Sequence, residues 1–350
     1  MTRLRLLLAA LLLPLGAVLA GCDTAGNPGA APAPETAVYV ANQGNFGDGN
    51  GSVTRYDPAD ETTRTAALDG LNSIVQSLAL RDTSLLVMAN TGPRIDAFST
   101  EGLSPIAQFT AVNSPRYAAF TGPSTAYVTD QSPFGSSLEP AVRILDLDAS
   151  SVVGSIRVSG TPEGITVADE RAYAALGAFG DTTLVAAIDL SSNVLDREID
   201  IDCAAREVVA DGDGDVYALC GNAAEAVILD AATGSVETRL ALPDTAETTF
   251  GVGHPAYYAA EAEELYVPTD AGILRVDTGA NAVDTMIDVG LSGPPGAVGY
   301  DAERQTLYVA RGAGFTASGT VTLHDRDGTQ TGSFTAGIAP TDIVIQQDAP

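Results

Sequence analysis

Two arginines and a histidine stand among polar residues that do not recur along the chain, and their types suit ligand recognition or hydrolysis. Arg116 and Arg206 could recognise a carboxylate, a phosphate or an amide-rich ligand, because a guanidinium presents a rigid fork of donors. Either arginine could instead pair with Glu163 or Glu207. His254, with Glu163 and an arginine, would suit a lactonase-like hydrolase, whereas a lone histidine is more often a hydrogen-bonded structural residue.

The sequence lacks the motifs that mark common catalytic sites. It contains no residue cluster at metal-ligand spacing, no G-x-S-x-G element and no Ser/His/Asp pattern. We therefore expect binding without catalysis, with no cofactor and no metal. Residues 211–215 (DGDGD) alternate carboxylates with glycines as a calcium loop does, but Val216 stands where an EF-hand loop needs glycine. An Asp-Gly hairpin turn is the simpler interpretation.

The net charge argues against several classes of partner. All 17 basic residues are arginines and 45 residues are acidic, so the formal net charge is −28. Nucleic-acid binding needs clustered cations that displace counterions from phosphates, and this chain is poor in them. The same charge disfavours docking on anionic lipid through a basic face. A hydrophobic content of 45% excludes a disordered chain.

The first residues indicate an export signal. Two arginines precede an apolar run over residues 6–19, which is too short to cross a bilayer as a helix. The run leads into L-A-G-C, and Cys22 in this context resembles the bacterial lipobox cysteine, which is acylated; the alternative is an ordinary signal peptide. We expect residues 1–21 to be a lipoprotein signal peptide and residues 22–36 a lipidated cysteine with a flexible tether. The protein would then be exported and lipid-anchored in the cell envelope, at the outer membrane or cell surface.

Beyond the tether, short β-rich runs recur every 40 to 49 residues. Each repeat contains four such runs, which we letter A to D in the order they take within a blade. Strand B is centred on a tyrosine, or once on a valine, at Tyr39, Val87, Tyr127, Tyr173, Tyr217, Tyr266 and Tyr308. Four strands in repeats of this length predict an all-β, seven-bladed β-propeller over residues 37–346.

The two ends of the repeat array indicate how the ring closes. The first repeat lacks strand A, whereas the last repeat supplies a surplus strand at residues 340–345. We expect this C-terminal strand to pair with the three N-terminal strands, because the pairing would cover an otherwise open sheet edge.

Loop lengths single out one face of the propeller. B–C and D–A loops share one end of the blades, and A–B and C–D turns share the other. The B–C loops have 8 to 11 residues in blades 1, 3, 4 and 7 but 3 to 5 elsewhere, and each long loop contains a phenylalanine: Phe46, Phe134, Phe179 and Phe315. We expect two aromatic walls facing across the central channel; the alternative is that each phenylalanine plugs its own loop. The predicted ligand-binding set is completed by D–A residues: Arg116, Glu163, Arg206 and His254.

Residues that recur from blade to blade are interpreted as scaffold, since an active site would be unique. Six aspartates open C–D turns, where an Asp side chain can accept hydrogen bonds from backbone N–H groups just ahead of it: Asp57, Asp146, Asp189, Asp230, Asp277 and Asp325. The strand-B tyrosines are expected to pack between neighbouring blades.

Cys203 and Cys220 remain beyond the lipidation site. A two-residue hairpin turn at residues 211–212 would place them directly opposite each other on strands A and B of blade 5. In an oxidising compartment we predict a disulfide that contributes roughly 3 kcal/mol. Two buried reduced thiols are the alternative.

The segment Y-V-A-N-Q-G-N at residues 39–45, with later copies such as L-Y-V-A at residues 307–310, resembles the YVTN/YncE-like seven-bladed propellers. The opening YVANQGNFGDGNGSVTRYDP resembles the lipoprotein branch of Bacteroidota and their relatives. Members differ widely in function, and some relatives are surface lipoproteins that capture cobalamin for an outer-membrane transporter. The resemblance thus implies a cobalamin-like ligand and an envelope partner such as a TonB-dependent receptor. We expect a ligand-binding propeller, with a lactonase-like hydrolase and a protein-interaction or structural propeller as alternatives.

Overall fold

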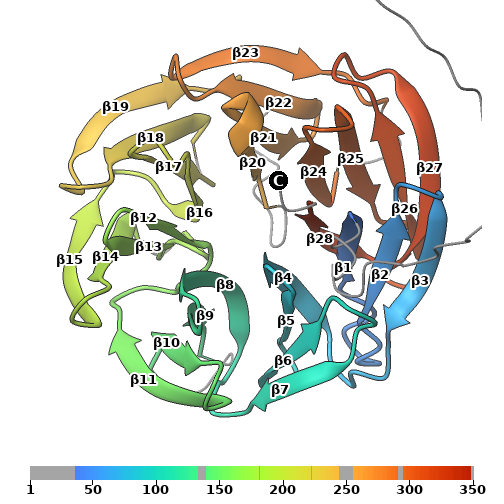
Figure 1. Cartoon of the computed structure of the whole chain (residues 1–350). Coiled ribbons are helices and arrows are strands. Elements are labelled where there is room, and N and C mark those ends of the chain that lie inside the picture. The colour runs from blue at the N-terminus through green and yellow to red at the C-terminus, as the bar shows by residue number, and fades with distance from the viewer. Residues whose placement is uncertain are drawn as a thin grey trace, which may run out of the picture. The chain divides into compact units, whose positions relative to one another are not determined.

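The computed structural model of the protein describes residues 36–132, 139–180, 182–221, 223–243, 255–290 and 295–347. Seven four-stranded antiparallel sheets are arranged as blades around one axis (Figure 1). The predicted all-β, seven-bladed β-propeller is therefore confirmed. Across the described ranges, no helix combines the length and apolar character needed to cross a membrane.

Each blade is a meander that runs from an innermost strand A to an outermost strand D. Blade 1 contains β28 (Pro340–Gln346), β1 (Ala37–Asn42), β2 (Ser52–Asp57) and β3 (Thr62–Leu68), and blade 2 contains β4 (Val75–Arg81), β5 (Ser84–Ala89), β6 (Arg94–Ser99) and β7 (Pro105–Phe109). Blade 3 contains β8 (Pro115–Gly122), β9 (Thr125–Asp130), β10 (Ala141–Asp146) and β11 (Ser151–Arg157), and blade 4 contains β12 (Ile165–Ala168), β13 (Arg171–Ala175), β14 (Leu184–Asp189) and β15 (Val194–Asp200). Blade 5 contains β16 (Ala205–Ala210), β17 (Asp215–Cys220), β18 (Glu225–Asp230) and β19 (Val236–Ala241). Blade 6 contains β20 (Tyr257–Ala259), the 3-10 helix η2 (Ala260–Ala262), β21 (Glu264–Thr269), β22 (Gly272–Asp277) and β23 (Ala282–Ile287), and blade 7 contains β24 (Ala297–Asp301), β25 (Thr306–Arg311), β26 (Ser318–His324) and β27 (Gln330–Ile338).

Blade 1 joins the two ends of the propeller. The surplus strand β28 pairs antiparallel with β1, and Tyr39 lies opposite Val344. Beyond the strands, the N–H of Gln43 donates to the carbonyl of Ala339 at 2.8 Å. The sheet order β28-β1-β2-β3 is consistent with the expected three-plus-one closure.

The hydrophobic core lies between the blades. Strand β5 (SLLVMA) has five consecutive buried residues, because neighbouring blades cover both of its faces. The strand-B tyrosines are each at most 1% exposed, and Tyr217 of blade 5 belongs to the same cluster as Leu265 and Val267 of blade 6. Their interpretation as inter-blade packing residues is confirmed.

The six repeated aspartates organise their own turns. The Oδ1 atom of Asp146 accepts the N–H of Ala149 at 2.8 Å, and that of Asp277 accepts the N–H of Ala280 at 2.8 Å. Equivalent bonds form at Asp57, Asp189, Asp230 and Asp325. The scaffold interpretation of these residues is therefore confirmed.

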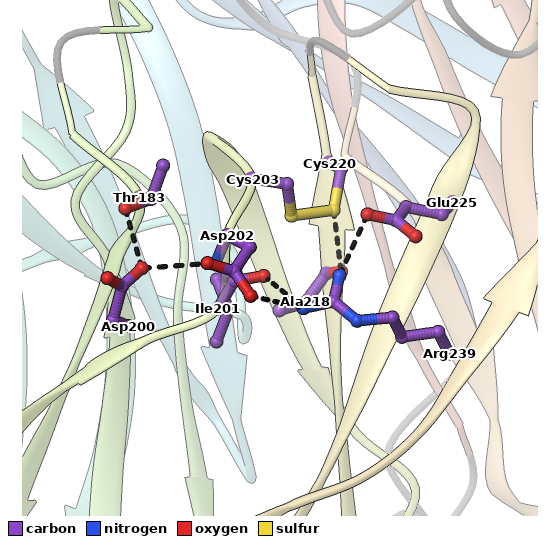
Figure 2. Close-up of a disulfide and its surroundings, with 9 residues drawn as sticks. All are labelled: Thr183, Asp200, Ile201, Asp202, Cys203, Ala218, Cys220, Glu225 and Arg239. Carbon is purple, nitrogen blue, oxygen red and sulfur yellow. Dashed lines mark hydrogen bonds and ion pairs between the residues drawn. A yellow bond between two sulfur atoms is a disulfide. The ribbon is translucent and has the colours of Figure 1, made fainter.

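A disulfide joins Cys203 to Cys220, with their Cα atoms 5.7 Å apart (Figure 2). Beside it, the guanidinium of Arg239 donates to Glu225 Oε1 at 2.9 Å and to the carbonyl of Ile201 at 2.8 Å. Because Cys203 lies in the connection between β15 and β16, the disulfide and Arg239 together fix the passage of the chain from blade 4 into blade 5.

The predicted hairpin register behind this disulfide is wrong. Cys220 lies opposite Ala205, so Cys203 precedes strand β16. Two local features cause the difference: the turn spans residues 211–215, and a bulge shifts the register after Ala205. Asp211 widens the turn, because its Oδ1 atom accepts the N–H groups of Asp213 at 2.9 Å and Asp215 at 3.0 Å.

Candidate functional site

The starts of the innermost strands form a ring around the propeller axis, here called the axial ring. It consists of two consecutive residues from each of six blades: Thr341–Asp342, Gln76–Ser77, Arg116–Tyr117, Glu163–Gly164, Arg206–Glu207 and Gly296–Ala297. The equivalent positions of blade 6 are 254 and 255, and the first of them lies outside the described residues. Neighbouring members touch: Thr341 Oγ1 donates to the carbonyl of Gln76 at 3.2 Å, and the N–H of Gly164 donates to the carbonyl of Arg206 at 2.9 Å. Apart from Ala297, these residues lie outside the hydrophobic clusters between the blades, so their types can differ.

Arg116 and Glu163 form a buried ion pair across blades 3 and 4. The Nε atom of Arg116 donates to both carboxylate oxygens of Glu163 at 3.1 Å, and a second guanidinium nitrogen also contacts Oε1. Burial by itself would lower the pKa of Arg116, but the charge of Glu163 and its hydrogen bonds outweigh burial and raise it. The pairing with Glu163, which the sequence left open, is therefore the arrangement in the structure.

Two glutamines extend this ion pair into a network. Gln76 is 0% exposed and accepts a hydrogen bond from Arg116 through Oε1, and its Nε2 atom donates to Tyr117 Oη at 3.4 Å. Gln131, at the end of β9, donates to Glu163 and to the carbonyl of Pro162. Sequence reasoning missed both glutamines. The signal for Gln76 is its place at the start of a strand A, equivalent to that of Arg116 and Glu163.

The axial ring also contains two carboxyl groups whose pKa values are raised. Burial raises the pKa of Asp342 to about 7, although hydrogen bonds from the N–H groups of Leu78 and Ile343 oppose the shift. Burial likewise raises the pKa of Glu207 well above its ordinary value; the N–H of Ala256, which donates to Oε1 at 2.7 Å, opposes this, and the charges of Asp342 and Glu163 add to it. In its protonated form, each of these carboxyls can donate as well as accept hydrogen bonds.

Arg206 differs from Arg116 in its surroundings. Its side chain is half-buried and lies against Gly221 at the end of strand B of blade 5. Within the part of the chain that the structure describes, no carboxylate forms an ion pair with it. Arg206 is thus the arginine of the axial ring whose charge is not neutralised by another described residue.

The described part of the ring is polar except at blade 7. Blades 1 to 5 contribute side chains that form hydrogen bonds, whereas blade 7 contributes Gly296 and Ala297. Gly296 allows a close approach of two chain segments, because a Cβ atom there would lie 2.3 Å from the carbonyl oxygen of Pro340.

Three of the predicted aromatic residues have exposed side chains. Phe46, Phe179 and Phe315 are 70%, 66% and 61% exposed, so they do not plug their own loops. Phe134 and His254 lie outside the described residues, as does Cys22. The ligand-binding role of the phenylalanines and of His254 stays a prediction, and so does the lipidation of Cys22. His324, the other histidine, is buried, and its ring nitrogens bond to Gly328 and Thr322.

Among the described residues, one group of three potential metal ligands lies close together: Cys203, Cys220 and Glu225. Both of its sulfur atoms are joined in the disulfide, so neither is available as a thiolate ligand. The chemistry that the axial ring offers is hydrogen bonding from amides, carboxyls and a tyrosine, together with one half-buried cation.

The blades and the polar axial ring define the protein as a seven-bladed β-propeller with a non-repeated ring of residues at its axis. The chain belongs to the family described as "Domain of unknown function (DUF5074)", whose model matches residues 36–332. No curated protein sequence matches the chain.

Two solved structures are similar in fold. The periplasmic gluconolactonase PpgL of Pseudomonas aeruginosa has a TM-score of 0.66 and 14% sequence identity, and the match covers 89% of this chain and 100% of that chain. The hydrazine synthase of Kuenenia stuttgartiensis has a TM-score of 0.64 and 14% identity, and the match covers 79% of this chain and 96% of that chain. At this level of identity, the similarity establishes a shared fold alone.

Proposed function

We propose that this protein is an exported, lipid-anchored propeller that binds a bulky, partly apolar ligand on the face of its B–C and D–A loops. The observation that carries the proposal is the axial ring, whose polar residues are not repeated, together with the exposed phenylalanines of the B–C loops. Exposed aromatic side chains contribute large contact areas when a ligand covers them, and a few polar groups then fix its orientation.

The charges of the axial ring favour a particular ligand chemistry. Glu163 neutralises Arg116, and Asp342 and Glu207 hold protons more tightly than ordinary carboxyls. This part of the ring therefore suits a ligand that carries amides or hydroxyls. Arg206 adds one cation, which suits a single carboxylate or phosphate on the same ligand.

Cobalamin, the ligand implied by the sequence resemblance, combines these chemical features. Its ring system has a large apolar surface, amide side chains surround the ring, and one phosphate is present. In this proposal, acylation of Cys22 holds the propeller at the outer membrane or cell surface, and a TonB-dependent receptor takes the ligand from it. Replacing Cys22 with alanine should abolish incorporation of labelled palmitate and release the protein from the membrane fraction.

Equilibrium dialysis with cyanocobalamin, followed by its visible absorbance, tests the binding proposal directly. Arg206→Ala should weaken binding by roughly tenfold, because a charge-assisted hydrogen bond to the ligand is lost. Arg239→Ala is the matched control, since Arg239 lies in the same blade but is paired with Glu225 and Asp202. If the unaltered protein retains no cyanocobalamin, cobalamin is excluded as its ligand. If Arg206→Ala binds cyanocobalamin as well as the parent protein does, the proposed role of Arg206 is wrong.

A lactone hydrolase is the second candidate, and the observation that favours it is the pKa of Asp342. A carboxyl with a pKa of about 7 can exchange a proton near neutral pH, as a general base or acid must. One similar structure is named a gluconolactonase, although the likeness shows the fold alone. Hydrolysis of glucono-δ-lactone should then exceed the uncatalysed rate and be lost in Asp342→Asn. A rate equal to the uncatalysed one would remove this candidate.

A further inference from the structure

A polar hollow lies apart from the axial ring, at the outer junction of blades 7 and 1. Its volume is about 600 Å³, within the range of small-molecule sites. Strands β3 and β27 and the turns near Pro58 and Arg304 line it, so it opens on the face of the A–B and C–D turns. Six of its lining residues carry aliphatic hydroxyls: Thr63, Thr65, Thr306, Thr331, Ser333 and Thr335.

At three other blade junctions, the hydroxyl of the strand-B tyrosine forms a hydrogen bond to the C–D turn of the next blade. Tyr127 donates its hydroxyl to Asn193 of blade 4, and Tyr217 donates to Asn281 of blade 6. Both asparagines are the fifth residue of a turn that opens with aspartate, and both adopt a left-handed backbone conformation with φ near 50° to 57°. Tyr173 reaches the backbone of the next turn instead, and donates to the carbonyl of Ala231 at 2.7 Å.

The junction of blades 7 and 1 lacks such a bond. The turn of blade 1 reads D-P-A-D-E, so Glu61 occupies the position of the two asparagines, with a left-handed φ of 55°, and its side chain is exposed. Tyr308 is 1% exposed and Tyr56 is 6% exposed, yet neither hydroxyl has a hydrogen-bond partner among the described residues. Both tyrosines line the hollow.

The base of the hollow is held rigidly by aromatic contacts. Tyr56 stacks on Phe334, with ring centroids 4.3 Å apart, and meets Tyr308 edge to face at 6.2 Å. These contacts fix the two phenol rings of the base, so their hydroxyls cannot move to find partners elsewhere. Neither hydroxyl oxygen belongs to the described polar atoms that are sealed from solvent without a partner, so both are open to the hollow and can form hydrogen bonds with a ligand that enters it.

The charged residues of the hollow do not favour an anion. Its one arginine, Arg304, is engaged by Asp301 at 3.1 Å and by Glu303 at 3.7 Å, while Glu61 adds a negative charge at the rim. We propose that this hollow binds a small neutral polyhydroxylated molecule, a monosaccharide or short oligosaccharide, through the hydroxyls of Tyr308 and Tyr56 and the surrounding threonines. The site is separate from the axial ring, so it does not depend on the function proposed there.

Saturation-transfer difference NMR of the purified protein with neutral sugars tests the proposal. The panel contains glucose, galactose, mannose, N-acetylglucosamine, maltose and cellobiose. At least one sugar should receive saturation, and Tyr308→Phe should weaken its binding about tenfold through loss of one buried hydrogen bond. Tyr173→Phe is the matched control, because its hydroxyl is used inside the protein, and it should leave sugar binding unchanged.

A variant that fills the hollow makes the test decisive. Thr335→Trp changes an exposed residue of β27, so the fold should persist, which an unchanged circular dichroism spectrum would verify. The bound sugar should be lost in this variant. The proposal is overturned if no sugar of the panel binds, or if binding survives Thr335→Trp. Tighter binding of glucose 6-phosphate than of glucose would overturn the assignment of a neutral ligand.

Discussion

Blades 4 and 6 are nearly interchangeable at their C–D turns and very different at the propeller axis. At the turns, Asn193 and Asn281 each accept the hydroxyl of the preceding blade's tyrosine. At the axis, blade 4 contributes Glu163, which is bound to Arg116. At the equivalent position, three residues before the residue opposite the strand-B tyrosine, the sequence of blade 6 has His254.

The contrast follows from what each position does for the fold. C–D turns meet the preceding blade, and six of them open with aspartate, so their residues recur. At the turn of blade 1, no bond to the tyrosine of blade 7 is formed, and a hollow lies there. The starts of the innermost strands only meet at the axis, and their side chains need not repeat. Repetition therefore marks the scaffold, and departures from repetition mark candidate sites.

The largest effect is expected from breaking the buried ion pair of the axial ring. Glu163→Ala leaves the guanidinium of Arg116 buried without its counter-charge, which should lower the free energy of unfolding by about 3–5 kcal/mol in urea denaturation. The double variant Arg116→Met/Glu163→Leu should recover most of the loss, because no unpaired charge remains. A cost below about 1 kcal/mol for Glu163→Ala would show that water or another group replaces the carboxylate.

The pH dependence of stability should report on Asp342. Its pKa is raised from 3.8 to about 7, so the folded protein binds a proton that the unfolded chain releases, and stability should fall as pH rises from about 4 to about 7. The fall due to this group is at most about 4 kcal/mol.

Asp342→Asn should flatten this fall in denaturation curves measured across the same pH range. Glu207 has a shift of the same direction, so part of the slope should remain. Asp48→Asn, at an exposed loop residue, is the control and should leave the pH profile unchanged. A parent protein whose stability rises over this range would contradict the burial of Asp342.

Removing the disulfide should lower the stability slightly less than full deprotonation of Asp342 does. Cys203→Ala/Cys220→Ala should lower the free energy of unfolding by roughly 3 kcal/mol, as expected for a closed loop with a sequence separation of 17 residues. Thermal melting with and without reductant measures the same change in the parent protein. The double variant should be insensitive to reductant; continued sensitivity would assign the effect to another cysteine.

The smallest loss of stability is expected from removing a single tyrosine hydroxyl, and two variants can be compared directly. Tyr173→Phe leaves the carbonyl of Ala231 without its donor and should cost about 1 kcal/mol, whereas Tyr308→Phe removes an unpartnered hydroxyl and should cost nothing measurable. Urea denaturation of both variants gives the two values side by side. Equal costs would mean that the hydroxyl of Tyr308 has a partner in solution.

The repeat pattern made most of the fold predictable, and the exceptions have local causes. The seven blades, the surplus strand and the turn aspartates follow from residues that recur at fixed spacing. The hairpin of blade 5 was misplaced because Asp211 binds two backbone N–H groups and turns a two-residue loop into a longer one. Gln76 was missed because nothing in its own sequence neighbourhood distinguishes it from an ordinary strand residue.

The sequence by itself determined the seven-bladed architecture, since burial of both faces of each blade demands the same residue types at the same strand positions. Only the tertiary structure decided which non-repeated residues meet. Arg116 pairs with Glu163, Arg206 keeps its charge free of a described carboxylate, and Tyr308 lines a hollow instead of a turn. Such pairings depend on side-chain contacts between blades that are 40 or more residues apart in the chain, and repeat spacing places the blades without specifying these contacts.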